Sequence, residues 1–284
     1  MKKLWALIGP RCIRAGKPGL WVVPMAELDL AWFAELKDRE LRKERIIIAE
    51  GRLVAERTAA FCDALGILCV PAALEDAEAI SRGTIPIQVL SEAEISKLAG
   101  YPFHRGLLFA ARRPELQPLS EAGTLVASGQ RLVVLPQITD PENLGAIIRT
   151  AAALGWDGIL LGPRSADPYS RRVLRCSMAA VFALPIYTFH GAGELELLAS
   201  TGWELWAAML SPDSCSPESL RQVKKLALML GNERFGLSQE MLNRSCAQVT
   251  IPQRRFEVDA VDSLNVAAAA AILLWEGRPG LISG

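Results

Sequence analysis

Three polar segments interrupt the apolar C-terminal half of the chain, and they contain the residue types that could do chemistry. The first covers residues 140–145 and leads into Arg149, the second covers 231–233, and the third covers 263–266. Each follows a short apolar stretch whose composition predicts a β-strand. Because ligand sites in α/β proteins are usually built from loops at strand ends, we expect the three segments to meet at one site.

The motifs that are absent narrow the chemistry of this site. No GxGxxG follows a strand and no GxxxxGK[ST] occurs, so nicotinamide and P-loop nucleotide chemistry lack their usual phosphate cradle. There is no GxSxG, and His104 and His190 lie outside the three segments, which disfavours a Ser-His-Asp hydrolase. The asparagine, arginine, glutamate and serine side chains of the segments can position a polar ligand and stabilise charge, but they supply no strong nucleophile.

Composition bounds the class of protein without identifying a partner. The chain has 284 residues, 51% of them hydrophobic, which is enough for one large or two medium domains. Its 31 basic and 31 acidic residues balance, and this neutrality neither supports nor excludes nucleic acid. Six cysteines without a CxxC pair and only two histidines argue against a metal site and for free thiols in a reducing cytoplasm.

Two apolar stretches could suggest a membrane, and both are too short for it. The N-terminal stretch ends at Gly9 and Pro10, which is shorter than the apolar region of a signal peptide. The run at 266–275 is about half the length that spans a bilayer, so we expect a buried helix there and no membrane partner.

The N-terminal part, residues 1–112, is expected to form a small α/β domain, with its first 25 or so residues unassigned. Helical spacing covers 28–45, a further helix is expected at 53–65, and apolar runs predict strands at 46–48, 68–70, 87–89 and 107–110. Residues 113–124 are rich in proline and polar side chains and are predicted to be a linker.

The C-terminal part, residues 125–284, is expected to form a mostly parallel sheet with helices on both faces. Strands are predicted at 132–135, 159–161, 203–208, 226–230 and 249–251, and helices at 141–154, about 170–181 and 263–276. Asp140 is a candidate N-cap with Pro141 at the first helical position.

Three sequence segments then resemble a known family. LPQITDPENLGAIIRTAAALG, LMLGNERFGLSQE and IPQRRFEVDAVDSLNVAAAAAILLWE are similar to the three ordered motifs of the SpoU/TrmH class of SPOUT methyltransferases, over about residues 130–277. The segments containing Asp167-Pro168 and Arg175-Cys176-Ser177 also resemble that family, and residues 40–112 more loosely resemble its small RNA-binding domain.

The resemblance implies transfer of a methyl group from S-adenosylmethionine to a ribose 2′-hydroxyl in RNA. Ribosomal RNA is favoured over transfer RNA, and the nucleotide stays open. The resemblance also implies a trefoil knot and a homodimer in which the first-motif arginine lies near the cofactor held mainly by the partner subunit.

The resemblance also assigns residues to the site. The cofactor would be surrounded by Leu230, Gly231, Asn232, Ile251, Leu264 and Asn265. The reaction centre would contain Asn143, Arg149, Glu233, Ser263 and Asn265. A guanidinium titrates far above neutrality, so we expect Arg149 to orient the acceptor and stabilise the developing alkoxide rather than to act as a base, and the proton acceptor is left unassigned.

Two groups of arginines are candidates for contact with RNA phosphates. They are Arg164, Arg171, Arg172 and Arg175 between the first two motifs, and Arg254 and Arg255 in the third.

The sequence also departs from the family pattern. The loop at 253–262 is longer than the family norm, and Ala179 and Ala267 replace a usual glycine and serine. The altered third motif keeps open a non-catalytic RNA-binding or assembly protein on the same fold. The near-neutral charge keeps open a methyltransferase that acts on a non-RNA acceptor.

Overall fold

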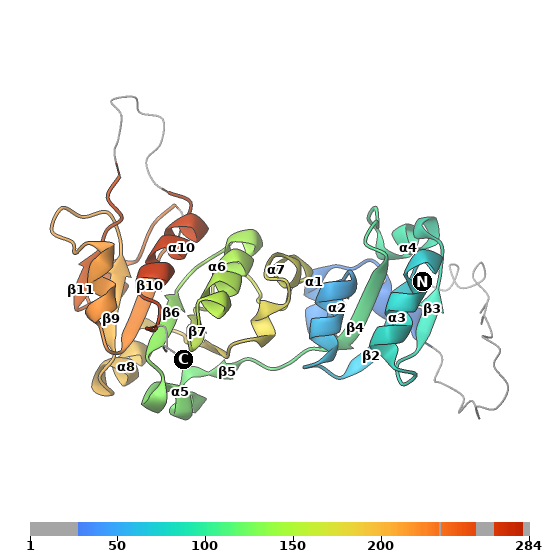
Figure 1. Cartoon of the computed structure of the whole chain (residues 1–284), viewed down its shortest axis with the longest axis horizontal. Coiled ribbons are helices and arrows are strands. Elements are labelled where there is room, and N and C mark those ends of the chain that lie inside the picture. Colours follow the sequence, from blue (N-terminus) through green and yellow to red (C-terminus); the bar gives the residue numbers. More distant parts are fainter. Residues whose placement is uncertain (1–27, 233, 254–263, 281–284) are drawn as a thin grey trace.

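A computed structural model describes residues 28–232, 234–253 and 264–280 of the chain. Two sheets lie at opposite ends of an elongated molecule, and α7 lies between them (Figure 1). The predicted residues Glu233, Ser263, Arg254 and Arg255 lie outside the described part.

The N-terminal sheet has four strands in the order β1-β4-β2-β3. They are β1 (Ile46–Glu50), β2 (Ala64–Cys69), β3 (Ile87–Val89) and β4 (Leu107–Arg112). β4 runs antiparallel to β1 and β2, and β3 runs parallel to β2. The accompanying helices are η1 (Leu30–Phe33), α1 (Asp38–Lys43), α2 (Arg52–Ala59), η2 (Pro71–Ala73), α3 (Leu74–Ser81) and α4 (Glu92–Ala99).

Two helix predictions in this part were wrong in extent. The expected helix at 28–45 is only η1 and α1, because Glu35 adopts a φ of 43° and its amide hydrogen-bonds to the carbonyl of Leu98 in α4. The expected helix at 53–65 ends at Ala59, because residues 64–69 pair as β2 with β4.

The C-terminal sheet has seven strands in the order β11-β9-β10-β6-β7-β8-β5, and every pairing is parallel. The strands are β5 (Gln117–Pro118), β6 (Arg131–Leu135), β7 (Gly158–Leu161), β8 (Ile186–Thr188), β9 (Glu204–Ala208), β10 (Leu226–Leu230) and β11 (Ala247–Val249). The predicted parallel sheet is confirmed. β5 lies inside the expected linker and β8 was not predicted. β11 overlaps the predicted strand at 249–251 only at Val249.

Helices cover both faces of this sheet, as predicted. Along β6, Val133 and Leu135 enter one core cluster while Leu132 and Val134 enter another. The first face carries α6 (Pro141–Ala153), α7 (Arg171–Cys176), η4 (Ala180–Phe182), η6 (Pro217–Gln222) and α10 (Val266–Glu276). The second carries η3 (Leu119–Glu121), α5 (Gly123–Ser128), η5 (Ala192–Leu195), α8 (Glu196–Ser200) and α9 (Gln239–Leu242).

The helix expected at about 170–181 is interrupted. Met178 and Ala179 have φ values of 53° and 60°, so α7 ends at Cys176 and η4 begins at Ala180. Ala179 is where the resembling family usually has glycine, and its left-handed backbone gives the physical reason for that preference.

The strand order determines where a ligand can enter. From β6 the chain continues to β7 and β8 on one side, and β9, β10 and β11 then form the other side. The order therefore reverses between β6 and β10, and the loops after these strands diverge at the carboxyl edge of the sheet. The knot stays a prediction, because residues 254–263 lie outside the described part. No helix among the described residues is long and apolar enough to cross a membrane.

Candidate cofactor and methyl-transfer site

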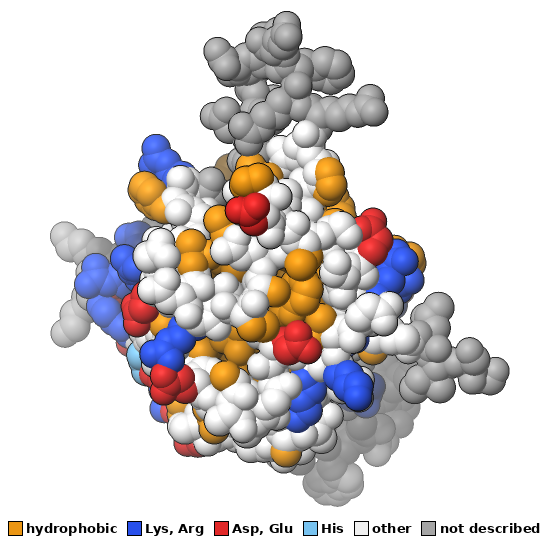
Figure 2. All heavy atoms as spheres, turned by 90° about the vertical axis from the view of Figure 1, so that its left-hand side faces the viewer, with side chains coloured by type: hydrophobic (Ala, Val, Ile, Leu, Met, Phe, Trp, Pro, Cys, Tyr) orange, Lys and Arg blue, Asp and Glu red, His pale blue; other side chains and the backbone are white. Residues whose placement is uncertain are grey.

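A cavity of about 290 Å³ opens at the carboxyl ends of β9, β10 and β11, against α10. Figure 2 views the end of the molecule that carries β9 and β11, where hydrophobic side chains gather across the middle of the face. The described lining residues carry no charge, and they are Ala208, Met209, Leu210, Leu230, Gly231, Asn232, Gly236, Leu237, Val249, Ile251, Gln253, Leu264, Val266, Ala269 and Leu273. Five of the predicted cofactor residues are among them, namely Leu230, Gly231, Asn232, Ile251 and Leu264.

The loop after β10 is a closed turn that only glycine permits at its start. A Cβ on Gly231 would lie 2.3 Å from the carbonyl carbon of Gly236 and 2.5 Å from the amide nitrogen of Leu237. The Asn232 amide donates to the Gly236 carbonyl at 3.0 Å, and the Gly236 amide donates back to the Asn232 carbonyl at 2.8 Å. This leaves backbone rather than side chain at the wall of the cavity.

The Asn232 side chain organises the same loop. Its Oδ1 accepts from the amides of Arg234 (2.9 Å) and Phe235 (3.3 Å), and its Nδ2 donates to the carbonyl of Gln137 at 3.4 Å. The second polar segment is thereby connected to the loop after β6, from which the first begins. Asn232 is nearly buried, so its role within the described residues is to hold two strand ends together.

The first and third polar segments also meet directly. Asn265 Nδ2 donates to Asn143 Oδ1 at 3.0 Å, which joins the start of α10 to the first turn of α6. Asn265 Oδ1 accepts from the amides of Ala267 and Ala268 and so caps α10, while Asp140 caps α6 through the amide of Glu142. The expectation that the three segments meet at one edge of the sheet is therefore met for their described residues.

Comparison with known proteins gives this arrangement its family. Residues 130–275 match the model of the SpoU rRNA Methylase family. An uncharacterized tRNA/rRNA methyltransferase of Mycobacterium bovis is 33% identical over 237 residues, which cover 81% of this chain and 80% of that protein. The 23S rRNA (guanosine(2553)-2′-O)-methyltransferase RlmP of Bacillus subtilis is 29% identical over 54% of this chain and 60% of its own length.

A solved structure agrees with the sequence match. The AdoMet-bound rRNA methyltransferase of Sinorhizobium meliloti aligns with a TM-score of 0.74 and 27% identity, covering 89% of this chain and 94% of that one. The chain belongs to the SpoU rRNA methylase family. The predicted class, an S-adenosylmethionine-dependent RNA methyltransferase of the SpoU/TrmH type, is confirmed.

The residues of this SpoU-family cavity fit S-adenosylmethionine. A flat adenine ring suits an apolar slot whose polar groups come mainly from backbone, and Leu230, Ile251 and Leu264 supply such walls. A Cβ on Gly231 would clash with the turn that forms the wall. Asn265, the remaining predicted cofactor residue, lies beside Asn143 and does not line the cavity.

Arg149, the first-motif arginine of this family member, lies apart from the cavity of its own chain. It is exposed on α6 and does not line the cavity, and its side chain has no hydrogen bond or ion pair with another described residue. A guanidinium in this position is available to a group outside the chain.

The four arginines between the first two motifs do not form one exposed cluster. Arg164 is exposed, Arg175 is half-buried, and Arg172 is exposed with its Nε 3.8 Å from a Glu142 carboxylate oxygen. Arg171 differs, because its guanidinium is bonded to the nearly buried Glu50 of the N-terminal domain, so the phosphate contact expected of it does not fit the structure.

Several residues near the site were missed from the sequence. Ala208, Met209 and Leu210 line the cavity at the end of β9, and that strand was predicted to end at 208. Because β9 lies beside β10 and runs parallel to it, the end of β9 lies at the same edge of the sheet as the three polar segments. The sequence alone did not show that these two strands are neighbours. No cluster of potential metal ligands occurs among the described residues.

Proposed function

We propose that this SpoU-family protein transfers a methyl group from S-adenosylmethionine to a ribose 2′-hydroxyl of ribosomal RNA. The observation that carries the proposal is the uncharged cavity beside the Asn143–Asn265 contact, at the carboxyl edge of a parallel sheet. The Bacillus subtilis relative is named as a 23S rRNA guanosine 2′-O-methyltransferase, which supports ribosomal RNA as the substrate. The nucleotide is not assigned by these observations.

The residues of the chain provide positioning and charge stabilisation. When bound, S-adenosylmethionine supplies a methyl group on a positively charged sulfur. The hydrogen bond between Asn143 and Asn265 fixes the starts of α6 and α10 relative to each other at the edge of the site. The positively charged guanidinium of Arg149 stabilises negative charge on the acceptor oxygen as its proton leaves.

We further propose a homodimer in which Arg149 serves the site of the partner subunit. α10 packs beside α6 and turns an apolar face outward, where Ile272 is 41% and Trp275 51% exposed and Ala268 and Ala271 are also exposed. Such a face is typical of a surface that is covered in an assembly. Arg149 does not line the cavity of its own chain, which agrees with action across this surface.

A mixed dimer tests this arrangement. Chains carrying Arg149→Ala retain an intact cavity, and chains carrying Gly231→Ala retain Arg149. Co-expression should give about a quarter of wild-type activity if Arg149 acts in trans, since half of the dimers are mixed and each has one complete site. Activity no higher than that of either variant alone would contradict action in trans.

The proposed substrate also suits a cytoplasmic location, which we propose together with it.

Deleting the gene and mapping 2′-O-methyl groups in ribosomal and transfer RNA tests the function. One ribosomal 2′-O-methyl group should disappear, and re-expression should restore it. Loss of no such group, together with RNA binding but no binding of S-adenosylmethionine at millimolar concentration, would instead indicate a non-catalytic RNA-binding protein.

A further inference from the structure

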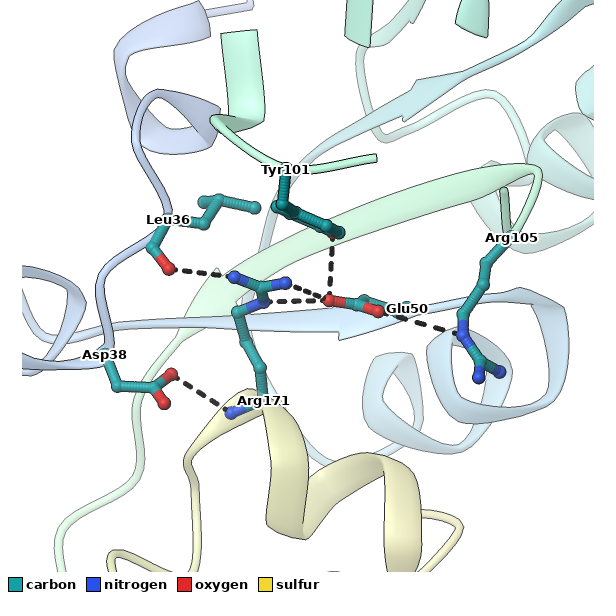
Figure 3. Close-up of polar contacts among 6 residues, drawn as sticks. All are labelled: Leu36, Asp38, Glu50, Tyr101, Arg105 and Arg171. Atoms are coloured by element: carbon teal, nitrogen blue, oxygen red, sulfur yellow. Dashed lines mark hydrogen bonds and ion pairs between the residues drawn. The ribbon is translucent and has the colours of Figure 1, made fainter. Parts of the chain in front are cut away.

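A buried ion pair joins the N-terminal domain to the methyltransferase domain. Arg171, the first residue of α7, extends into the N-terminal domain, and Glu50 lies at the end of β1 (Figure 3). Arg171 Nε donates to Glu50 Oε1 at 2.8 Å, and Nη2 donates to the same oxygen. The Glu50 side chain is 4% exposed and that of Arg171 is 18% exposed, so both charges are largely removed from water.

Directional hydrogen bonds surround this pair. Arg171 Nη1 donates to the carbonyl of Leu36 at 2.8 Å, and its guanidinium carbon lies 4.3 Å from the centre of the Tyr101 ring. The Tyr101 hydroxyl donates to Glu50 Oε1 at 3.0 Å. Arg105 approaches the other Glu50 oxygen at 3.9 Å. Leu36, Tyr101 and Arg105 all belong to the N-terminal domain. Each of them contacts either Arg171 or Glu50.

The start of α7 is held by the same domain. Asp38 Oδ1 accepts from the backbone amide of Arg171 at 3.2 Å, so a carboxylate of α1 meets the positive end of α7. The arrangement fixes the arginine at three points, namely its backbone amide, the Leu36 carbonyl and the Glu50 carboxylate. A planar guanidinium bound in several directions restricts rotation as well as separation.

The segment after β7 makes further contacts across the same boundary. Arg113, the first residue of the expected linker, forms a two-pronged pair with Asp167 at 2.9 and 2.7 Å. Arg57 of the N-terminal domain donates to the carbonyl of Met178 at 2.7 Å. Phe61 stacks on Phe182 with ring centroids 5.8 Å apart. The segment between β7 and β8 therefore serves as the docking element for the N-terminal domain, and α7 packs against α6, which carries Asn143 and Arg149.

We propose that the Glu50–Arg171 pair is a positioning device that fixes the orientation of the N-terminal domain, and thereby the presentation of RNA to the methyl-transfer site. This rests on the proposed function. Arg171 acts through the domain it holds and touches neither cofactor nor acceptor. Because methyl transfer requires close alignment, a misplacement of about 1 Å lowers the rate about a hundredfold, so a loosened domain should slow reaction with RNA and leave cofactor binding intact.

The test compares Arg171→Met, Arg171→Lys and the double variant E50M/R171M with wild type. Removing one partner leaves a buried charge unpaired, whereas removing both relieves that penalty. We expect R171M to lower kcat/KM for unmodified 23S rRNA transcript about tenfold to a hundredfold, with the Kd for S-adenosylmethionine within about twofold of wild type. R171K should lie between R171M and wild type, since it keeps the charge but not the planar geometry.

The double variant separates orientation from stability. If the pair orients the domain, E50M/R171M recovers the Tm of wild type but not its kcat/KM for RNA, and small-angle X-ray scattering shows a broader distance distribution than wild type. If kcat/KM recovers together with Tm, or if R171M weakens cofactor binding as much as it slows RNA methylation, the proposal is overturned.

Arg244→Met is the matched control. It removes an arginine from an exposed pair with Glu196 on the second face of the C-terminal sheet. It should leave both kcat/KM for RNA and the Kd for S-adenosylmethionine unchanged. Failure of the proposed function would look different, because wild type itself would then not methylate RNA while the scattering difference between wild type and E50M/R171M would persist.

Discussion

Replacing Gly231 with alanine tests the geometry of the cofactor cavity most sharply. The added Cβ would lie 2.3, 2.5 and 2.7 Å from three backbone atoms of Gly236 and Leu237, where ordinary contacts begin near 3.4 Å. The turn must move by about 1 Å, and overpacking of this kind costs about 1–3 kcal/mol. Opening the two Asn232–Gly236 hydrogen bonds would cost about 1 kcal/mol each.

The free-energy cost of Gly231→Ala should appear either as a loss of stability or as a loss of cofactor affinity. If the turn keeps its shape, the free energy of unfolding falls by about 2 kcal/mol; if the turn opens, cofactor affinity falls by about thirtyfold, since 1.4 kcal/mol is a factor of ten. We expect most of this cost to appear as reduced cofactor affinity, because the turn forms the cavity wall and can move without disturbing β10.

Isothermal titration with S-adenosylmethionine and a thermal melt of the same samples measure both quantities. Gly193→Ala is the control, because a Cβ there has open space around it and should change neither. Unchanged affinity together with an unchanged Tm in G231A would refute the turn geometry. Unchanged affinity with a lowered Tm would mean that the turn keeps its shape, which would contradict the expectation that most of the cost falls on cofactor affinity.

Three further predictions concern single residues. Asn265→Ala should lose the cap of α10 and about 1 kcal/mol of stability, whereas Asn265→Asp keeps the capping oxygens and loses the donor to Asn143; chemical denaturation should therefore separate them, and equal losses would contradict the capping role. Ala179→Gly should raise the free energy of unfolding by up to about 1 kcal/mol, because glycine tolerates the φ of 60°, and a lower Tm would count against this reasoning. Burial, with a further contribution from Glu78, raises the pKa of Cys69 to about 11, so its thiol stays protonated at pH 8 with about one thiolate in a thousand. Its alkylation by iodoacetamide, followed by peptide mass spectrometry, should be far slower than that of exposed Cys215 at pH 8 and should rise steeply between pH 9 and 11, and equal rates at pH 8 would contradict the buried environment.

Local signals in the sequence predicted the elements that hold the site. Asp140 and Pro141 marked the start of α6 because capping depends on neighbouring residues alone, and the structure shows the Asp140 cap. The run at 132–135 predicted β6 because a strand covered on both faces is apolar throughout. Such features could be found without knowing which strands are neighbours.

The errors arose where distant parts of the chain decide the local structure. Gln117 and Pro118 look like a linker, yet they form β5 because Tyr187 and Thr188 lie beside them. Arg171 looks like one of four solvent-exposed arginines, but its partner Glu50 is 121 residues away in the chain. Helical periodicity also could not show the interruption at Met178 and Ala179, because the chain leaves α7 there and contacts Arg57 of the N-terminal domain.

The central claim is that this cavity holds the methyl donor for a ribose 2′-hydroxyl of RNA. The most direct measurement incubates unmodified 23S rRNA transcript with the protein and S-adenosylmethionine carrying a deuterated methyl group, and then identifies labelled nucleosides by mass spectrometry. We predict one labelled 2′-O-methyl nucleoside with wild type and a strongly reduced amount with Arg149→Ala, which should still bind the donor. Label on a base, or full activity in Arg149→Ala, would contradict the account.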